Sequence, residues 1–218
     1  LRIMAHYSKE PALIQAFEDD ADIHSRTAAL VNGIHVSDVT PEQRRSAKVV
    51  NFGIMYGAGP YRMSQELGIT MDESRKLIDH YFNTYPGIRR YMDETIKNAR
   101  KNGYVETLYK RRRRTMDLSA SNKNLVHAAE RAAINMPIQG TAADLIKIAM
   151  INIHKRMNSE QYKSKMILQI HDELLFECPK IEVREFAEIV QHEMETAVRL
   201  LVPLKVDWNY GKNWYEAH

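Results

Sequence analysis

Four side chains repeat at a spacing of four residues, and their types suit chemistry on phosphates. They are two cations, Arg44 and Lys48, followed by two aromatic residues, Phe52 and Tyr56. Residues four apart are neighbours on a helix, so all four would share one face. Cations bind phosphates, and aromatic rings stack on a sugar or a base. The pattern favours a nucleoside triphosphate as ligand, while an amphipathic helix with a solvated basic end is the alternative.

Two glycines, Gly53 and Gly57, accompany the aromatic half of this face. A glycine inside a helix costs about 1 kcal/mol relative to alanine, so an ordinary surface helix has no reason to contain two. Their lack of a side chain would leave room for a base pair to approach. We therefore expect a binding face here.

A second pattern consists of two adjacent carboxylates, Asp172 and Glu173, between the apolar runs 166–170 and 174–178. The runs predict two short strands with His171 and Asp172 at the turn. A tight turn holds and exposes its carboxylates, and Mg²⁺ binds carboxylate oxygens while leaving room for phosphates and water. An ordinary acidic turn is the alternative. Neighbouring strand residues point to opposite sides, so the two carboxylates need not bind the same ion.

A third pattern repeats Arg131, Asn135 and Gln139, again four residues apart. On one helical face, these side chains could contact phosphates and the minor-groove acceptors that all base pairs share. Such contacts would tolerate any sequence. A polar helix face is the alternative, and Pro137 makes the alignment of Gln139 depend on how the helix passes it.

The nucleotide-binding face needs a well-defined helix, and capping signals predict one. Thr40, Pro41 and Gln43 supply a capping hydroxyl, a proline at the first helical position and the partner of a capping box. This helix should run over 41–56 and end at the glycine-rich run 57–60. Thr70 with Glu73 starts a second helix through about residue 80, and a third should end at Gly103.

The other elements are predicted from periodicity and turn residues. Ser8 should cap a helix to about residue 17, residues 104–114 should form an irregular basic hairpin, and Pro137 should break or kink the helix that begins near 124. Residues 181–201 should be helical and 203–208 a final strand. The result is an α+β fold, with a helical block over about 20–116 and a small antiparallel sheet in the remainder.

Composition limits the class of protein. The 218 residues suit one domain or two small ones, and 44% hydrophobic residues suffice for a core. Cys178 is the only cysteine, which excludes a disulfide framework and a cysteine-rich zinc site and fits a reducing compartment. No apolar run approaches about 18 residues, so no membrane span is expected. A net charge of +3 neither requires nor excludes nucleic acid, so a non-catalytic binding module and a purely structural protein stay open as alternatives.

The ordered set of motifs resembles family A DNA polymerases of the bacterial type. Residues 44–57 are similar to the family's motif B helix, residues 131–140 to its primer–template motif, and residues 169–173 to its motif C. Residues 22–24 and 209–214 also resemble this family. The resemblance covers essentially the whole chain, with the motifs in the expected order.

The resemblance implies a helical fingers subdomain inserted in a palm that has a small antiparallel sheet. Residues 1–22 would be a partial palm, 23–117 the fingers and 118–218 the rest of the palm, with the thumb absent. It also implies template-directed transfer of a nucleotide from a dNTP to a primer 3′-hydroxyl, with a two-metal mechanism. Primer–template DNA, dNTPs and the remainder of the polymerase chain would be the partners, in the bacterial cytoplasm at the nucleoid.

The resemblance also implies roles for individual residues. His24, Arg44, Lys48, Phe52 and Tyr56 would bind the nucleotide, with Phe52 near the sugar and Tyr56 at the template position. Arg131, Asn135, Gln139 and His171 would bind DNA. The catalytic residues would be Asp172, which binds two Mg²⁺ ions, Glu173 in an auxiliary role, and Lys48, which also helps to protonate the leaving pyrophosphate.

The sequence departs from the family pattern in two places. Only Leu1 and Arg2 match the end of motif A, so the second metal-binding carboxylate is expected upstream of Leu1 and the chain is expected to be inefficient alone. The family usually places Asp or His and then Gly in its fingers hairpin, whereas this chain has Tyr109 and Lys110 before the basic run 111–114. That run would be either solvated or a salt-dependent contact to phosphates.

Overall fold

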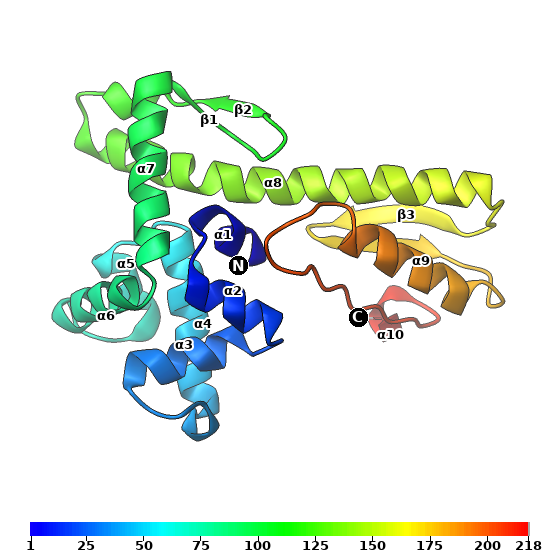
Figure 1. The fold of residues 1–218 in the computed structure, drawn as a ribbon, viewed down its shortest axis with the longest axis horizontal. Coiled ribbons are helices and arrows are strands. Elements are labelled where there is room, and N and C mark those ends of the chain that lie inside the picture. Colours follow the sequence, from blue (N-terminus) through cyan, green and yellow to red (C-terminus); the bar gives the residue numbers. More distant parts are fainter. Residues whose placement is uncertain (218) are drawn as a thin grey trace. The chain divides into compact units, whose positions relative to one another are not determined.

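The structure is a computed structural model that describes residues 1–217, and these form two compact units, Leu1–Thr141 and the part that begins at Ala142. The first unit is mainly helical (Figure 1), and its elements are α1 (Arg2–Ser8), α2 (Pro11–Glu18), α3 (Ile23–Asn32), η1 (Val36–Asp38), α4 (Pro41–Met55), α5 (Pro60–Leu67), α6 (Met71–Thr84), α7 (Pro86–Asn102), β1 (Tyr104–Glu106), β2 (Arg112–Arg114) and η2 (Met116–Ser119). Helix α8 (Lys123–Ser159) runs from the first unit into the second. The second unit adds β3 (Lys165–Ile170), β4 (Glu173–Glu177), α9 (Val183–Glu195) and α10 (Trp214–Ala217).

The chain start forms two helices, and the predicted Ser8 cap is wrong. Ser8 is the last residue of α1, and Glu10 caps α2 through its side chain. Glu10 is almost completely buried, where Oε1 accepts from the Ala12 N–H at 3.3 Å and Oε2 accepts from the Gly87 N–H at 2.7 Å. One carboxylate therefore satisfies the N-termini of both α2 and α7, where a negative charge is favourable. A β-carbon on Gly87 would lie 2.8 Å from Glu10 Oε2, so this contact requires glycine.

The predicted capping boxes are confirmed at α4 and α6. Thr40 Oγ1 accepts from the Gln43 N–H, and the Gln43 side chain accepts from the Thr40 N–H. Thr70 and Glu73 make the same reciprocal pair at α6. Helix α7 ends at Gly103, which has φ +77° as expected of a glycine C-cap. These helices begin and end where local hydrogen bonds place them.

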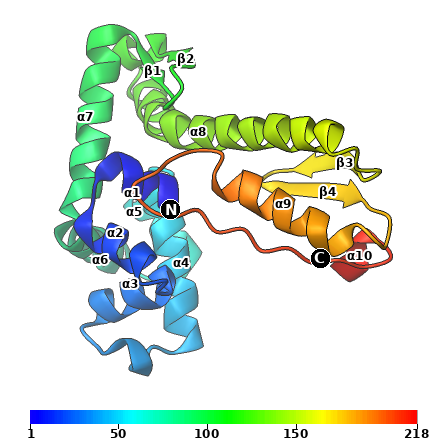
Figure 2. The same ribbon diagram turned by 45° about the vertical axis from the view of Figure 1, so that its right-hand side comes forward.

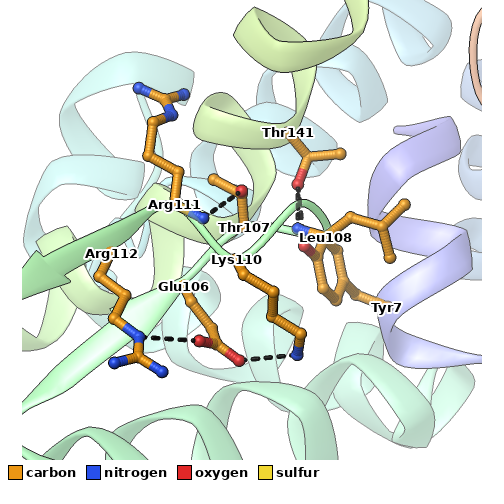
Figure 3. Close-up of polar contacts among 8 residues, drawn as sticks. All are labelled: Tyr7, Glu106, Thr107, Leu108, Lys110, Arg111, Arg112 and Thr141. Atoms are coloured by element: carbon orange, nitrogen blue, oxygen red, sulfur yellow. Dashed lines mark hydrogen bonds and ion pairs between the residues drawn. The ribbon is translucent and has the colours of Figure 1, made fainter.

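The predicted basic hairpin forms even though it lacks the family's glycine. Strands β1 and β2 pair antiparallel from Tyr104 opposite Arg114 to Glu106 opposite Arg112. A hydrogen bond from the Thr107 N–H to the Arg111 carbonyl closes a loop of residues 108–110. Lys110, at the end of this loop, takes up the left-handed conformation with φ +65°, where a hairpin of this length favours glycine. The Glu106 carboxylate accepts from both Lys110 and Arg112, as Figure 3 shows. The hairpin geometry is thus kept at the cost of one strained lysine.

The same hairpin is attached to α8 and α1 through Thr141. Thr141 is fully buried, and its hydroxyl accepts from the Leu108 N–H at 3.1 Å and lies 2.8 Å from the Tyr7 hydroxyl (Figure 3). Arg111 donates to the Gly140 carbonyl at 2.7 Å. A β-carbon on Gly140 would lie 2.6 Å from a methyl carbon of Thr107, so close packing requires this glycine. The loop is therefore held rigidly at its base.

We expect Lys110→Gly to stabilise the chain. Glycine adopts positive φ without steric cost, so the midpoint of thermal unfolding should rise by about 2–4 °C. The lost ion pair with Glu106 contributes little, because its lysine end is exposed to solvent. Lys110→Ala is the matched control, because it removes the same ion pair but keeps the β-carbon. Equal midpoints for the glycine and alanine variants in a calorimetric scan would contradict this explanation.

Of the two outcomes predicted at Pro137, a break or a kink, the break does not occur. Helix α8 is one element of 37 residues with Pro137 inside it. Ala133, Ile134 and Ile138 are buried around the proline, and the Tyr91 hydroxyl donates to the Ile134 carbonyl at 3.2 Å. Tertiary contacts therefore hold the helix where local preference would end it.

The second unit contains the predicted carboxylate hairpin. Strands β3 and β4 pair antiparallel from Lys165 opposite Glu177 to Ile170 opposite Glu173, with an irregularity between Met166 and Leu168. The later part of α8 and helix α9 pack with this sheet, as Figures 1 and 2 show. The core comprises Ile146, Ala149, Ile153, Phe186, Val190 and Met194, with Met166, Leu174 and Phe176 packed against it.

Two predictions for the chain end are wrong. Helix α9 spans Val183–Glu195 instead of 181–201. Residues 203–208 form no strand. Side chains of α9 instead satisfy the backbone of Val206, whose N–H donates to Glu195 at 2.9 Å and whose C=O accepts from Gln191 at 2.7 Å. Val206 also packs against the core of the second unit. The segment 203–208, whose alternating apolar residues suggest a strand, therefore packs along α9 instead.

Candidate nucleotide-binding face and carboxylate turn

Helix α4 presents the predicted cations to solvent. Arg44 and Lys48 are exposed, while Ala47, Val50 and Ile54 on the opposite side are buried. The rings of Phe52 and Tyr56 are nearly parallel, with centroids 6.4 Å apart. Tyr56 is the C-cap residue, one position beyond the helix, yet its ring stays in line with that of Phe52. The helix thus forms the ordered face of cations and rings that its spacing predicts.

His24 joins this face from helix α3. Its ring lies 5.7 Å from the Phe52 ring between centroids, and Asn51 of α4 lies 3.1 Å from its Nδ1. Burial lowers the pKa of His24 below its usual value; Asp22 opposes this effect, and the nearby positive charges of Arg44 and Lys48 reinforce it. His24 is therefore neutral at pH 7 and can donate one N–H.

Asp22 organises two of these groups at once, a role that the sequence did not suggest. Its carboxylate caps α3 by accepting from the N–H groups of His24 and Ser25, at 2.9 and 3.2 Å. The same carboxylate pairs with the guanidinium of Arg44. Partial burial opposes ionisation of Asp22, but the hydrogen bonds from Arg44, Ser25 and His24 outweigh it and lower its pKa. The arrangement fixes Arg44 beside the start of α3.

Gly53 and Gly57 are required by packing within the chain itself. A β-carbon on Gly53 would lie 2.6 Å from the terminal methyl of Met63 in α5. Gly57 has φ +71°, and a β-carbon there would lie 2.8 Å from the Arg131 side chain. The two glycines let α5 and Arg131 approach α4. The space for a base pair that we expected beside them stays a prediction.

Arg131, Asn135 and Gln139 lie on one face of α8, because the helix continues through Pro137. Arg131 and Gln139 are exposed and Asn135 is half-buried. Asn135 donates to the Tyr56 carbonyl at 3.4 Å, so this face of α8 meets the aromatic end of the α4 face. Within the first unit, the structure therefore brings together the predicted nucleotide-binding residues and three of the predicted DNA-binding residues.

The carboxylate turn is as predicted from the sequence. His171 and Asp172 form the two-residue turn between β3 and β4, and Glu173 is the first residue of β4. All three are exposed, and Gln169 donates to the His171 carbonyl at 3.0 Å. His171 has φ +54°, a costly conformation for a residue with a β-carbon and one that occurs often at functional sites.

The donor set at this turn fits a magnesium ion only in part. Mg²⁺ commonly uses one or two carboxylates and takes its other ligands from water and phosphate oxygens, and an exposed Asp172 meets the first requirement. No group of three or more His, Cys, Asp or Glu side chains that could hold a metal occurs within residues 1–217. A complete site would therefore need phosphate oxygens or a further carboxylate.

Comparison with known proteins identifies the family of the chain. A profile of DNA polymerase family A matches residues 1–216, so the chain belongs to this family. The chain is 50% identical over 218 residues to DNA polymerase I of Streptococcus pneumoniae (strain TIGR4) and 50% identical over 217 residues to that of Caldicellulosiruptor bescii. Each match covers 100% of this chain but only 25% and 26% of the relatives, so the chain spans about a quarter of their length.

A solved structure supports the same assignment. The chain is similar to the POL domain of Pol1 from M. smegmatis, in complex with DNA primer–template and dNTP, with a TM-score of 0.96 and 42% sequence identity. The match covers 99% of this chain and 38% of that one. Together with the mainly helical structure and its two small antiparallel sheets, it confirms the α+β fold expected from the sequence.

Proposed function

We propose that this chain carries the nucleotide-binding face and one metal-binding carboxylate of a DNA-directed DNA polymerase. The polymerase would join a dNTP to a primer 3′-hydroxyl and release pyrophosphate. The observation that carries the proposal is the exposed face of α4, where two cations precede two aligned rings beside His24. Membership of DNA polymerase family A supports it.

Each residue of the face has a separate task in this proposal. Arg44, Lys48 and the neutral His24 would bind the triphosphate, and Lys48 would also donate a proton to the departing pyrophosphate. Phe52 would lie against the sugar and Tyr56 at the template position, where stacking tolerates any base. Asp22 would keep Arg44 in place before the nucleotide arrives.

Asp172 would hold the metal, with Glu173 in an auxiliary role and His171 near the primer end. When bound, Mg²⁺ would lower the pKa of the primer hydroxyl and offset the charge that develops on the phosphate. The exposed hairpin tip lets Asp172 supply a carboxylate oxygen without repacking the core. Because the described residues gather no third donor, we expect the chain by itself to catalyse extension poorly.

Arg131, Asn135 and Gln139 would contact primer–template DNA along α8. In this proposal the fingers subdomain spans residues 23–117, and the palm consists of residues 1–22 and 118–218. This functional division differs from the two compact units, because α8 belongs to both. No helix in residues 1–217 is long and apolar enough to cross a membrane. The proposed activity would place the protein on DNA in the bacterial cytoplasm.

Primer extension tests the proposal. The chain would be compared with a longer polypeptide that also includes the sequence preceding this region in a family A relative, on a primer–template duplex with dNTPs and Mg²⁺. We expect template-dependent extension by the longer polypeptide, its loss when Mg²⁺ is chelated, and little extension by the chain alone. No extension by the longer polypeptide would contradict the polymerase function.

The basic hairpin gives a separate prediction about DNA affinity. Arg113 and Arg114 are exposed, and neither forms an ion pair with another residue in the described part of the chain. If both contact phosphates, Arg113→Ala with Arg114→Ala should reduce the slope of log affinity against log salt by about 1.8 for duplex DNA. Fluorescence anisotropy at several salt concentrations measures this slope.

The matched control is Arg75→Ala with Lys76→Ala, which removes two exposed positive charges from α6. It changes the net charge equally and should leave the slope nearly as in the wild type. Equal slopes for the hairpin variant and the control would show that the basic run is merely solvated.

A further inference from the structure

A chain of four buried or half-buried polar side chains runs behind the nucleotide-binding face. The Tyr85 hydroxyl lies 3.1 Å from Thr27 Oγ1, and Thr27 contacts Asn51, whose Nδ2 lies 3.1 Å from His24 Nδ1. Thr27 and Asn51 are fully inaccessible to solvent and Tyr85 almost so. Buried polar groups without partners are costly, so these hydrogen bonds define the arrangement of the side chains.

The amide of Asn51 is oriented with its Nδ2 toward His24. Thr27 Oγ1 donates to Asn51 Oδ1 at 3.3 Å and accepts from Nδ2 at 3.1 Å. The second hydrogen of Nδ2 is then directed to His24 Nδ1. An imidazole nitrogen that accepts a hydrogen bond carries no hydrogen, so a neutral ring must carry its hydrogen on Nε2.

We propose that Asn51 is a positioning residue that holds His24 in the neutral tautomer with the hydrogen on Nε2, ready to donate to a triphosphate oxygen. The inference rests on the proposed nucleotide role of His24. Among the described residues Nε2 has no hydrogen-bond partner, so it is the ring atom left to bind a ligand. The opposite orientation of the Asn51 amide would place an oxygen against Nδ1 and reverse the tautomer.

The surroundings favour the neutral ring. The charged groups that act on His24 are Asp22 at the start of α3, Arg44 and Lys48 on α4, and the amino terminus. Burial is the largest effect and lowers the pKa of His24, which agrees with a neutral ring at pH 7. A donor facing Nδ1 has the same consequence, because protonation would set two N–H groups against each other.

Nitrogen NMR reads the tautomer directly. The full 218-residue chain, labelled with ¹⁵N in histidine, would be studied by long-range ¹H–¹⁵N correlation between pH 5 and 8, with His24→Gln to assign the signals. We expect His24 to show an unprotonated Nδ1 and a protonated Nε2. A hydrogen on Nδ1 in the wild-type chain would overturn the proposal.

Two variants test the role of Asn51. Asn51→Asp has the same shape but places an acceptor against Nδ1, so Nδ1 should become protonated and the titration midpoint of His24 should rise by about 1 pH unit or more. Thr27→Val removes the hydroxyl that bonds both atoms of the Asn51 amide, so the amide is held less firmly and both tautomers should appear. Thr27→Val also tests the proposal if the buried aspartate prevents Asn51→Asp from folding.

Asn32→Asp, at the exposed end of α3, is the matched control and should change neither the tautomer nor the titration midpoint of His24. Wild-type tautomer and midpoint in both variants would overturn the proposal.

Adding a dNTP separates this inference from the proposed function. In the wild-type chain, the nucleotide should shift the Nε2 signal of His24, and in Asn51→Asp the shift should differ. If the tautomer is as proposed but the nucleotide moves no His24 signal, the positioning role of Asn51 is supported and the nucleotide-binding role of His24 fails.

Discussion

Asp172→Asn should reduce primer extension by about a thousandfold or more while leaving DNA affinity unchanged. The expected loss follows from the several kcal/mol that metal ions contribute to the transition state, since each 1.36 kcal/mol corresponds to a factor of ten. Asparagine keeps the shape of the side chain but is a poorer ligand for Mg²⁺. Asp172 is exposed at the hairpin tip, so the variant should fold normally. The rate would be measured by single-turnover extension in the longer polypeptide.

Two neighbouring carboxylates serve as controls for this prediction. Glu173→Gln should cost less activity, because Glu173 lies on the strand beside the turn and its proposed role is only auxiliary. Glu177→Gln, at the other end of β4, should leave the rate unchanged. If all three variants extend the primer equally well, Asp172 does not hold the catalytic metal.

Lys48→Ala should have the second largest effect, a loss of about a hundredfold or more in the rate of nucleotide incorporation. General acid catalysis contributes about 10²–10⁴-fold, and Lys48 would also lose its attraction for the triphosphate. Because Lys48 is exposed on α4, its removal should not disturb the buried side of the helix. Pre-steady-state kinetics over a range of dNTP concentrations gives the maximal rate and the nucleotide affinity separately.

Lys48→Arg separates the two roles proposed for the lysine, which are binding of the triphosphate and donation of a proton. Arginine keeps the positive charge but does not release its proton, so nucleotide affinity should be retained while the maximal rate falls. Lys76→Ala, at an exposed position of α6, is the control for a lost surface lysine. Full recovery of the rate in the arginine variant would show that charge alone is required.

Elements whose signals are local could be predicted from the sequence. The capping boxes at Thr40 and Thr70 and the stop at Gly103 depend on hydrogen bonds or backbone angles within a few residues, and all three are found in the structure. The carboxylate turn is likewise set by two apolar strands that adjoin it. In these cases the interactions that determine the structure are made between residues close together in the sequence.

Elements whose secondary structure depends on contacts with residues distant in the sequence could not be predicted. Pro137 stays inside α8 because buried neighbours and Tyr91 support the helix there. Residues 203–208 are not a strand, and Gln191 and Glu195 of α9 occupy the C=O and N–H of Val206 that a neighbouring strand would need. Neither set of partners is visible in the local pattern.

The candidate site divides in the same way. The spacing of Arg44, Lys48, Phe52 and Tyr56 predicts a common face, since a single helix carries them. The contacts of Asp22 with Arg44 and of Asn51 with His24 join α3 to α4 across more than twenty residues, and no spacing rule indicates them. Only the folded chain shows that two side chains without an expected role organise the two flanks of the face.

The carboxylate of Glu10 that caps both α2 and α7 restricts how this region can diverge. Gly87 has no room for a β-carbon, which would lie 2.8 Å from Glu10 Oε2 and 3.0 Å from the Ser8 carbonyl oxygen. Removing the Glu10 carboxylate would leave the N–H of Gly87 buried without its acceptor. Each change is unfavourable, so relatives that share this backbone should retain glutamate at position 10 and glycine at position 87 together. A chimera with a crossover between them would inherit a compatible pair only if both parents carry glutamate and glycine.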